Sequence, residues 1–187
     1  MKKDIAVLLA VVLLIGGAFK FGLINIQSVE EYYSVHCDDV ENADKTVFLT
    51  VDCSDVIQNY DMLEENLCDE KFVPSDGKII PETEFVLLDG DSVFDILDRA
   101  ARSQRIPLDY QGAGDNGYKT VYVKGINNLY EFSCGPSSGW TYTVNGESPD
   151  KGCSQYIPKD GDEIEFYYVC DYTKSNKSDV GEGGGRR

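Results

Sequence analysis

Histidine and tryptophan are nearly missing from this chain, which has one of each, His36 and Trp140. Zinc sites are built from several closely spaced Cys or His ligands, and the chain has neither a Cys-x-x-Cys pair nor a second histidine. We therefore expect no zinc site, and we interpret His36 as a solvated loop residue, the alternative being a ligand to a metal such as cobalt. A Ser-His-Asp triad is also disfavoured, because His36 lies in a polar segment before the first expected strand. The sequence thus predicts a protein that is not an enzyme.

Positive charge is also scarce, with 17 Lys and Arg against 33 Asp and Glu and a formal net charge of −16. A surface this acidic repels nucleic acid and acidic membrane faces, so nucleic-acid binding is excluded. We interpret the excess of acid as a means of solubility outside the cell, with storage of cations as the alternative.

Long apolar runs are confined to the N-terminus, where residues 5–19 are apolar after Lys2 and Lys3. This run is shorter than the ~20 residues of a full membrane span, so residues 1–26 are either a tilted membrane anchor or an export signal. A signal peptide would be cut after the small residues 16–18. Both alternatives place the rest of the chain outside the cytoplasm. Residues 27–45 are then a polar stalk, and residues 173–187 are expected to be a disordered tail.

Cysteine, by contrast, is present in an even number and is spread along the chain. An exported chain with such cysteines is expected to form disulfides, here three. The pair Cys134 and Cys153 is favoured, because the two residues flank one expected hairpin. The candidates are Cys37, Cys53, Cys68, Cys134, Cys153 and Cys170.

The hydrophobic periodicity predicts several strands and one helix. Alternation with a period of two marks the strands, and recurrence at helical spacing marks one amphipathic helix at about residues 92–104. Ser92 and Asp95 form a capping-box pattern at its start, and Arg99 is placed on its polar side. The fold class is therefore α+β, a small mixed β-sheet domain with one helix packed across it. The expected strands cover residues 46–56, 78–81, 84–88, 106–110, 119–126, 140–144 and 163–169.

The stretch from Gly135 to Gly152 is the most distinctive part of the chain. It holds Trp140, which shares one strand face with Tyr142 and Val144, and it continues into an Asn-Gly dipeptide at 145–146 that favours a tight hairpin. The second arm of this hairpin is expected to run from residue 152 to residue 157. The Asp-Gly-Asp sequences at 89–91 and 160–162 are interpreted as turns, because neither has the acid spacing of an EF-hand loop.

A set of motifs in a fixed order resembles one bacterial family of unknown function. The first half has V-D-C-S, V-P-S-D-G and D-G-D-S-V-F-D-I-L, and the second has Y-V-K-G-I-N-N-L-Y-E-F-S-C-G, S-G-W-T-Y-T-V-N-G, G-C-S-Q-Y and K-D-G-D-E-I. That family is similar to the C-terminal domain of transcobalamin and intrinsic factor. The resemblance covers about residues 46–172 and implies a β-grasp-like, transcobalamin C-terminal-like domain. Together with the basic start and the export segment, it indicates a Gram-positive cell surface.

The resemblance also implies a ligand class, since the animal proteins cap one face of cobalamin with this domain. An aromatic side chain rimmed by amides and hydroxyls suits a large flat ligand. Trp140 has a second interpretation, that of a core residue beneath the hairpin. The candidate ligand-binding residues are Ser138, Gly139, Trp140, Tyr142, Asn145 and Tyr156.

The carriers enclose their ligand between this domain and a large helical domain, which this sequence lacks. A corrinoid site on this chain would therefore be half a site that needs a partner, such as a helical domain or a membrane uptake system. No built-in cofactor is expected. The predicted function is an extracytoplasmic binding module, attached to the envelope or secreted, that captures cobalamin or another corrinoid. The alternative is a structural or adhesive surface module that binds a protein or a glycan.

Overall fold

A computed structural model describes residues 43–114, 117 and 119–173. The predicted export segment, His36, Cys37 and all of the predicted tail except Thr173 lie outside the described residues, as does the stalk up to residue 42. Among the described residues, no helix combines the length and the hydrophobicity that a membrane span requires.

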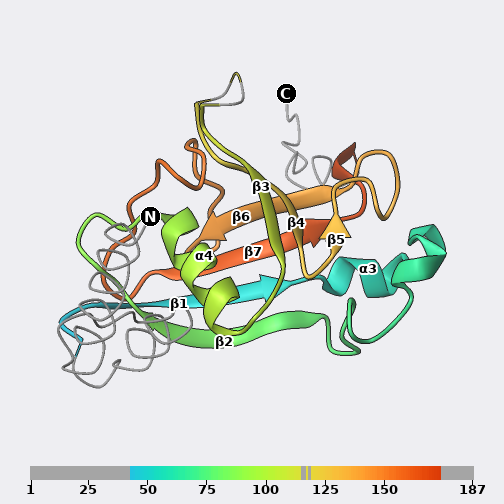
Figure 1. Ribbon diagram of the computed structural model, residues 1–187, viewed down its shortest axis with the longest axis horizontal. Helices are drawn as coiled ribbons and strands as arrows, with labels where there is room; N and C mark the ends of the chain where they lie inside the picture. The colour runs from blue at the N-terminus through green and yellow to red at the C-terminus, as the bar shows by residue number, and fades with distance from the viewer. Residues whose placement is uncertain (1–42, 115–116, 118, 174–187) are drawn as a thin grey trace, which may run out of the picture. The chain divides into compact units, whose positions relative to one another are not determined.

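A four-stranded mixed sheet forms the centre of the structure (Figure 1). Its strand order is β2-β1-β7-β6, with β1 and β7 parallel in the middle and an antiparallel partner on each outer side. This arrangement, with a helix crossing one face, is β-grasp-like and confirms the α+β class. The strands are β1 (Thr46–Asp52), β2 (Lys78–Val86), β6 (Gly139–Val144) and β7 (Glu163–Val169).

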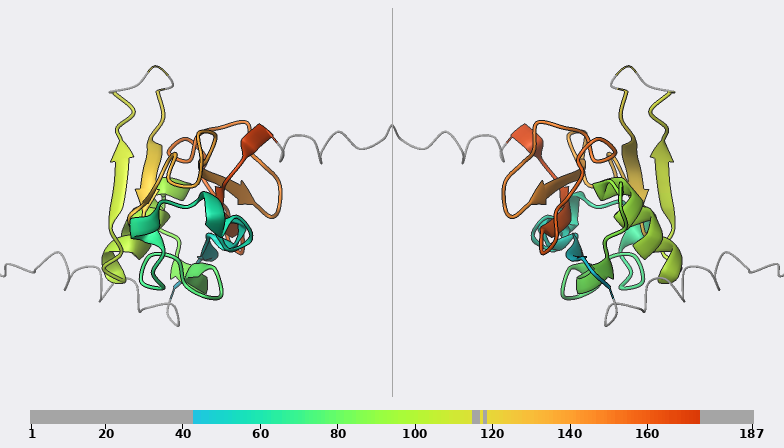
Figure 2. Two further views of the ribbon diagram at one scale, coloured as in Figure 1. Left: turned by 90° about the vertical axis from the view of Figure 1, so that its right-hand side faces the viewer. Right: turned by 90° about the vertical axis from the view of Figure 1, so that its left-hand side faces the viewer.

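Alternating residues of the two central strands form the core. Val47, Leu49 and Val51 of β1 are fully buried, and so, within 2%, are Ile164, Phe166 and Tyr168 of β7. The helix α4 (Val93–Ser103) lies over this face (Figures 1 and 2). A second sheet, ordered β3-β4-β5, lies on the same side and consists of β3 (Leu108–Gln111), β4 (Tyr122–Ile126) and β5 (Leu129–Tyr130). The buried residues of each central strand share one face, as the alternation with a period of two predicts.

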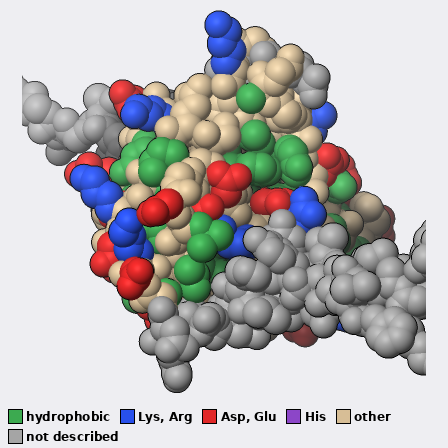
Figure 3. All heavy atoms as spheres, turned by 60° about the vertical axis from the view of Figure 1, so that its left-hand side comes forward, with side chains coloured by type: hydrophobic (Ala, Val, Ile, Leu, Met, Phe, Trp, Pro, Cys, Tyr) green, Lys and Arg blue, Asp and Glu red, His purple; other side chains and the backbone are tan. Residues whose placement is uncertain are grey.

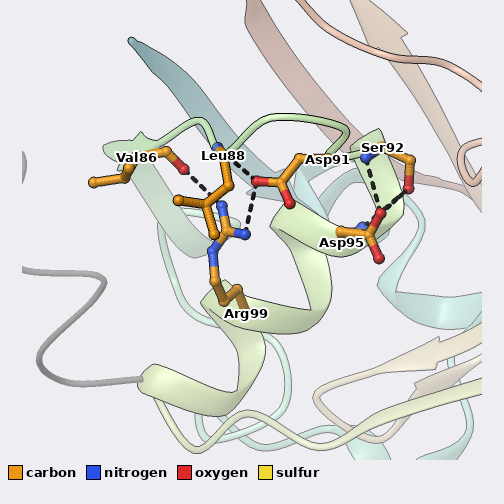
Figure 4. Close-up of polar contacts among 6 residues, drawn as sticks. All are labelled: Val86, Leu88, Asp91, Ser92, Asp95 and Arg99. Atoms are coloured by element: carbon orange, nitrogen blue, oxygen red, sulfur yellow. Dashed lines mark hydrogen bonds and ion pairs between the residues drawn. The ribbon is translucent and has the colours of Figure 1, made fainter. Parts of the chain in front are cut away.

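The start of α4 is fixed by the capping box that the sequence predicts. The Ser92 hydroxyl accepts a hydrogen bond from the Asp95 N–H, and the Asp95 carboxylate accepts one from the Ser92 N–H (Figure 4). Two further N–H groups of the first turn donate to the carbonyls of Cys153 and Tyr156. The loop around residues 152–157 thus satisfies the helix N-terminus, which would otherwise leave donors without partners.

Arg99 departs from its predicted place on the polar side of the helix. It is 7% exposed and pairs with Asp91, with Nη1 to Oδ2 at 2.7 Å, while Nη2 donates to the Val86 carbonyl at 2.6 Å (Figure 4). The Asp91 carboxylate also accepts from the Leu88 N–H at 2.9 Å. The first Asp-Gly-Asp turn therefore anchors α4 to the end of β2 through a buried ion pair, which helical periodicity alone does not reveal.

Two predictions of strand bounds were wrong. The first strand ends at Asp52 instead of Val56, because the Asp52 carboxylate accepts from the N–H and hydroxyl of Ser54 and turns the chain into α3 (Ser54–Gln58). Short 3₁₀ turns follow at Tyr60–Met62 and Glu65–Leu67. The two strands expected at 78–81 and 84–88 are the single strand β2. Pro81 is tolerated there, because β2 lies at the sheet edge and its pairing is irregular near that residue.

The prediction of a second hairpin arm after Trp140 was also wrong. Asn145 and Gly146 both have positive φ, 54° and 76°, and form the predicted tight turn. After the isolated bridge between Val144 and Glu147, the chain leaves the sheet, and β6 pairs along its length with β7. Residues 152–157 do not form a strand.

Candidate functional site

Trp140 lies in the core on the helix side of the sheet. Its side chain packs edge-on against Tyr168, with ring centroids 5.2 Å apart, and its Nε1–H donates to the Leu129 carbonyl at 2.8 Å. The residue is 8% exposed. Of the two interpretations left open by the sequence, the structure matches that of a core tryptophan, which joins β6 to the start of β5.

Ser138 and Gly139 are buried beside it. The Ser138 hydroxyl accepts from the Cys134 N–H at 3.1 Å, donates to the Gly135 carbonyl at 2.9 Å, and lies 2.9 Å from the Tyr168 hydroxyl. Burial raises the pKa of Tyr168 to about 12, although the hydrogen bond with Ser138 opposes the shift. These contacts fix the loop before β6 and do not point the serine to solvent.

The other three candidate residues occupy partly exposed positions with structural contacts. Tyr142 stacks on Phe166 at 5.5 Å, its hydroxyl donates to the Lys151 carbonyl, and burial raises its pKa. The Asn145 amide donates to Asp162 and accepts from the Glu163 N–H, each at 2.9 Å. Tyr156 is half-buried against the core. The structure therefore spreads the six candidates between the core, a turn and a helix-capping loop.

The face of the four-stranded sheet opposite α4 carries the polar members of each strand. On this face Thr143, Glu165 and Thr50 form one row across β6, β7 and β1, since Glu165 is the register partner of both threonines. Phe48 and Glu163 form the next row toward the end of the sheet where β7 begins. We call this surface the open face.

Two adjoining cavities hollow the open face. The larger has a volume of about 460 Å³ and the smaller about 360 Å³, and both are lined by Thr143, Gly146 and Glu165. The larger extends over β1 and β2, and the smaller extends toward α3 and Asp52. Together they form a groove. Its larger part is lined by Phe48, Thr50, Lys78, Glu82, Glu163 and Glu165.

The groove is lined by more carboxylates than basic side chains. Lys78 pairs with Asp52, and the hydrogen bond with Asp52 raises the pKa of Lys78, with the charge of Glu165 adding to the shift. Burial acts to raise the pKa of Asp52, but the hydrogen bonds from Lys78 and Ser54 outweigh it and leave that pKa below its usual 3.8. Glu82, Glu163 and Glu165 form no ion pair with any described residue. The larger part of the groove therefore presents free carboxylate and hydroxyl acceptors beside the Phe48 ring.

Thr143 has a distinctive position in this groove. It is 9% exposed, it lines both cavities, and its hydroxyl has no hydrogen-bond partner among the described residues. The described residues hold no group of three or more His, Cys, Asp and Glu side chains suited to a metal ion. Sequence reasoning missed this surface, although the alternation of Phe48, Thr50 and Asp52 with the buried residues of β1 was the available signal.

Comparison with known proteins supports the family resemblance. Residues 90–169 match the family model described as "Domain of unknown function (DUF4430)". This match confirms that the second half of the chain resembles a family of unknown function. No curated protein matches the chain in sequence.

Two solved structures are similar to this chain at low identity. A proposed metal-binding protein from Ruminococcus gnavus ATCC 29149 is 14% identical with a TM-score of 0.42, over 67% of this chain and 97% of that chain. Haptocorrin in complex with Cbi is 13% identical with a TM-score of 0.42, over 78% of this chain and 26% of that chain. With TM-scores below 0.5, neither structure carries an argument about the site.

Proposed function

We propose that this protein is an extracytoplasmic binding module, attached to the envelope or secreted, that binds a corrinoid in the groove of the open face together with a partner. The observation that carries the proposal is the groove itself, with free acceptors and an aromatic ring on a rigid sheet. Binding sites are typically concave, with a few polar groups that fix orientation. The motif resemblance names corrinoids as the ligand class to test first.

The chemistry of the groove suits a ligand with amide side chains. The carboxylates of Glu163 and Glu165 and the Thr143 hydroxyl are available as hydrogen-bond acceptors, and the Phe48 ring offers an apolar surface. The amide N–H groups of a corrinoid are donors, and hydrogen bonds to a carboxylate contribute more than those between neutral groups. The larger cavity, about 460 Å³, would hold part of such a ligand and leave the rest to a partner.

The test is equilibrium dialysis of the purified full chain against cobinamide and cobalamin, followed by the absorbance of the corrin. Trp140 fluorescence is a poor reporter, because the side chain is buried on the opposite side of the sheet. We expect saturable binding, weakened about tenfold by Glu165→Gln or Thr143→Val, since ~1.4 kcal/mol of lost interaction is tenfold in affinity. Glu70→Gln is the matched control, because Glu70 is exposed and lines neither cavity. Absence of saturation at millimolar corrinoid contradicts the proposal.

A second candidate is an adhesive module that binds a glycan, favoured by aromatic residues exposed near the three-stranded sheet. Tyr122 and Tyr130 are each 40% exposed and Phe132 is 59% exposed. The Tyr130 ring packs against Gly125, where a Cβ atom would come within 2.6 Å of it. Exposed aromatic rings offer apolar surfaces on which sugars can stack. Cosedimentation with purified peptidoglycan that is lost in Phe132→Ala, with corrinoid binding absent, would favour this function over the first.

A further inference from the structure

Cys134 and Cys170 meet at the end of the sheet where β7 ends. Cys134 follows β5, and Cys170 follows β7 directly. The bridge between Ser137 and Asp171 and the hydrogen bond from the Tyr172 N–H to the Ser137 carbonyl hold the two segments together. A Cβ atom on Gly135 would lie 3.7 Å from the Cys170 carbonyl oxygen. The Cys134 thiol donates to the Asn59 carbonyl at 3.6 Å, and the thiols of Cys134 and Cys170 lie close enough for each to shift the pKa of the other. Both residues are at most 1% exposed.

We infer that Cys134 and Cys170 form a disulfide in the exported protein. Each thiol loses its hydrogen as the S–S bond forms. The two electrons and two protons pass to an incoming disulfide, either of a thiol-disulfide oxidoreductase or of oxidised glutathione, which is reduced to two thiols. The inference rests on the export part of the proposed function, because such bonds persist in oxidising compartments.

The other described cysteines lack such a neighbour. Cys153, the partner favoured by sequence spacing, has its sulfur 3.5 Å from the Val121 carbonyl, and the Cys68 sulfur is 3.6 Å from the Glu64 carbonyl. Cys53 is fully buried, and burial raises its pKa to about 12. All five described cysteines are thiols in the structure. Spacing favoured Cys153 because it assumed that residues 152–157 return along β6, whereas β7 is the strand that does so.

The surroundings of the pair indicate when the bond forms. The attacking species in disulfide exchange is a thiolate. Burial raises the pKa of both thiols, and the nearby charge of Asp55 raises them further. Asp55 is held in place, since it accepts from the Cys170 N–H at 2.8 Å. Exchange in the folded protein is therefore slow in both directions, so the bridge forms before β7 docks and resists reductants afterwards.

The disulfide would stabilise the strands that carry the groove. The segment between the two cysteines contains β6 and β7, and hence Thr143 and Glu165. A covalent link across this segment restricts the unfolded chain more than the folded one, which stabilises the fold. It is a structural bond rather than a regulatory one, because both sulfurs are shielded from small thiols.

The test is a peptide map of the full chain, refolded in a glutathione buffer and alkylated without reduction. We expect one linked peptide pair containing Cys134 and Cys170, lighter by two hydrogens than the sum of the reduced peptides. Alkylation of both thiols, or a link from Cys134 to Cys153, overturns the pairing. If the link forms in this buffer but the chain purified from cells is reduced, the pairing stands and the export assignment fails.

Variants supply a second readout. We expect Cys134→Ala, Cys170→Ala and the double variant to lower Tm by a similar amount, roughly 10 °C, because each removes the same bridge. The exposed Cys68→Ala is the matched control and should leave Tm unchanged. Reduction of the unfolded wild-type protein before refolding should bring its Tm down to that of the double variant. If the losses of Tm in the two single variants add up in the double variant, and reductant does not change the Tm of the wild type, the cysteines contribute by packing alone and the inference is overturned.

Discussion

The two faces of the four-stranded sheet use the same strands for different purposes. On the covered face, Val51, Phe166 and Trp140 pack under α4 and the second sheet and are almost without solvent contact. On the open face, Thr50, Glu165 and Thr143 line a groove. A strand places successive side chains on opposite faces, so neighbouring residues have separate roles. The comparison teaches that Trp140 and Tyr142, both expected in the binding site, lie on the opposite side of the sheet from the groove.

At the end of the sheet where α4 and β7 begin, hydrophobic, acidic and basic side chains are interleaved on the surface (Figure 3). Both Asp-Gly-Asp turns lie at this end, around a cavity of about 270 Å³. In the first turn Asp91 pairs with Arg99, and in the second Asp160 accepts from the Thr46 N–H and Asp162 accepts from the Asn145 amide. These turns hold elements together, as the interpretation of both as turns predicts.

The largest effect is expected on the covered face. Trp140→Ala should lower the free energy of unfolding by about 3–5 kcal/mol, because it leaves a cavity and an unpaired Leu129 carbonyl. Thr50→Val, a change of similar shape on the open face, should change it by less than ~0.5 kcal/mol. Urea unfolding followed by circular dichroism measures both. Equal costs at the two positions would show that the faces do not differ as described.

Asp91→Asn tests the ion pair that fixes the helix to the covered face. The substitution should lower the free energy of unfolding by about 3 kcal/mol, since it leaves Arg99 buried without its counter-charge. Asp89→Asn in the same turn is the control. That side chain is 97% exposed and pairs with Lys45 at the surface, so the expected cost is below ~0.5 kcal/mol. Urea midpoints that shift equally would contradict the assignment of Arg99 as a buried anchor.

Asp52→Asn tests the ion pair at the rim of the open face. At neutral pH the substitution should lower the free energy of unfolding by about 2 kcal/mol, because the carboxylate accepts hydrogen bonds from Lys78 and Ser54. The pKa of Asp52 in the folded state lies below its usual 3.8, so its contribution to stability is present above that pH and is lost as the pH falls through the folded pKa. The difference between wild type and variant should therefore shrink below about pH 4 in thermal melts. A constant difference across this range would contradict the linkage.

The smallest effect on stability is expected from Glu165→Gln in the groove. The carboxylate has no ion pair among the described residues, so the free energy of unfolding should change by less than ~0.5 kcal/mol, while corrinoid affinity falls about tenfold. Measuring melting and dialysis on one preparation separates the two readouts. A large loss of stability would make Glu165 a structural residue and remove it from the proposed site.

Much of the fold could be predicted from local sequence. The alternation in β1 and β7 predicted which residues share a face, Ser92 with Asp95 predicted the helix start, and Asn145-Gly146 predicted the turn. The candidate site could be predicted less well. Trp140 was distinctive by its rarity, but rarity does not tell whether a ring faces solvent or the core.

The amino-acid sequence by itself determined the periods, caps and turns, because these depend on residues within a few positions of one another. Tertiary structure alone decided that β6 pairs with β7, that Arg99 is buried against Asp91 and that Cys134 meets Cys170. It also decided which face of the sheet α4 leaves open. These outcomes depend on contacts between distant segments, whose partners are chosen by packing of the whole core and not by local pattern.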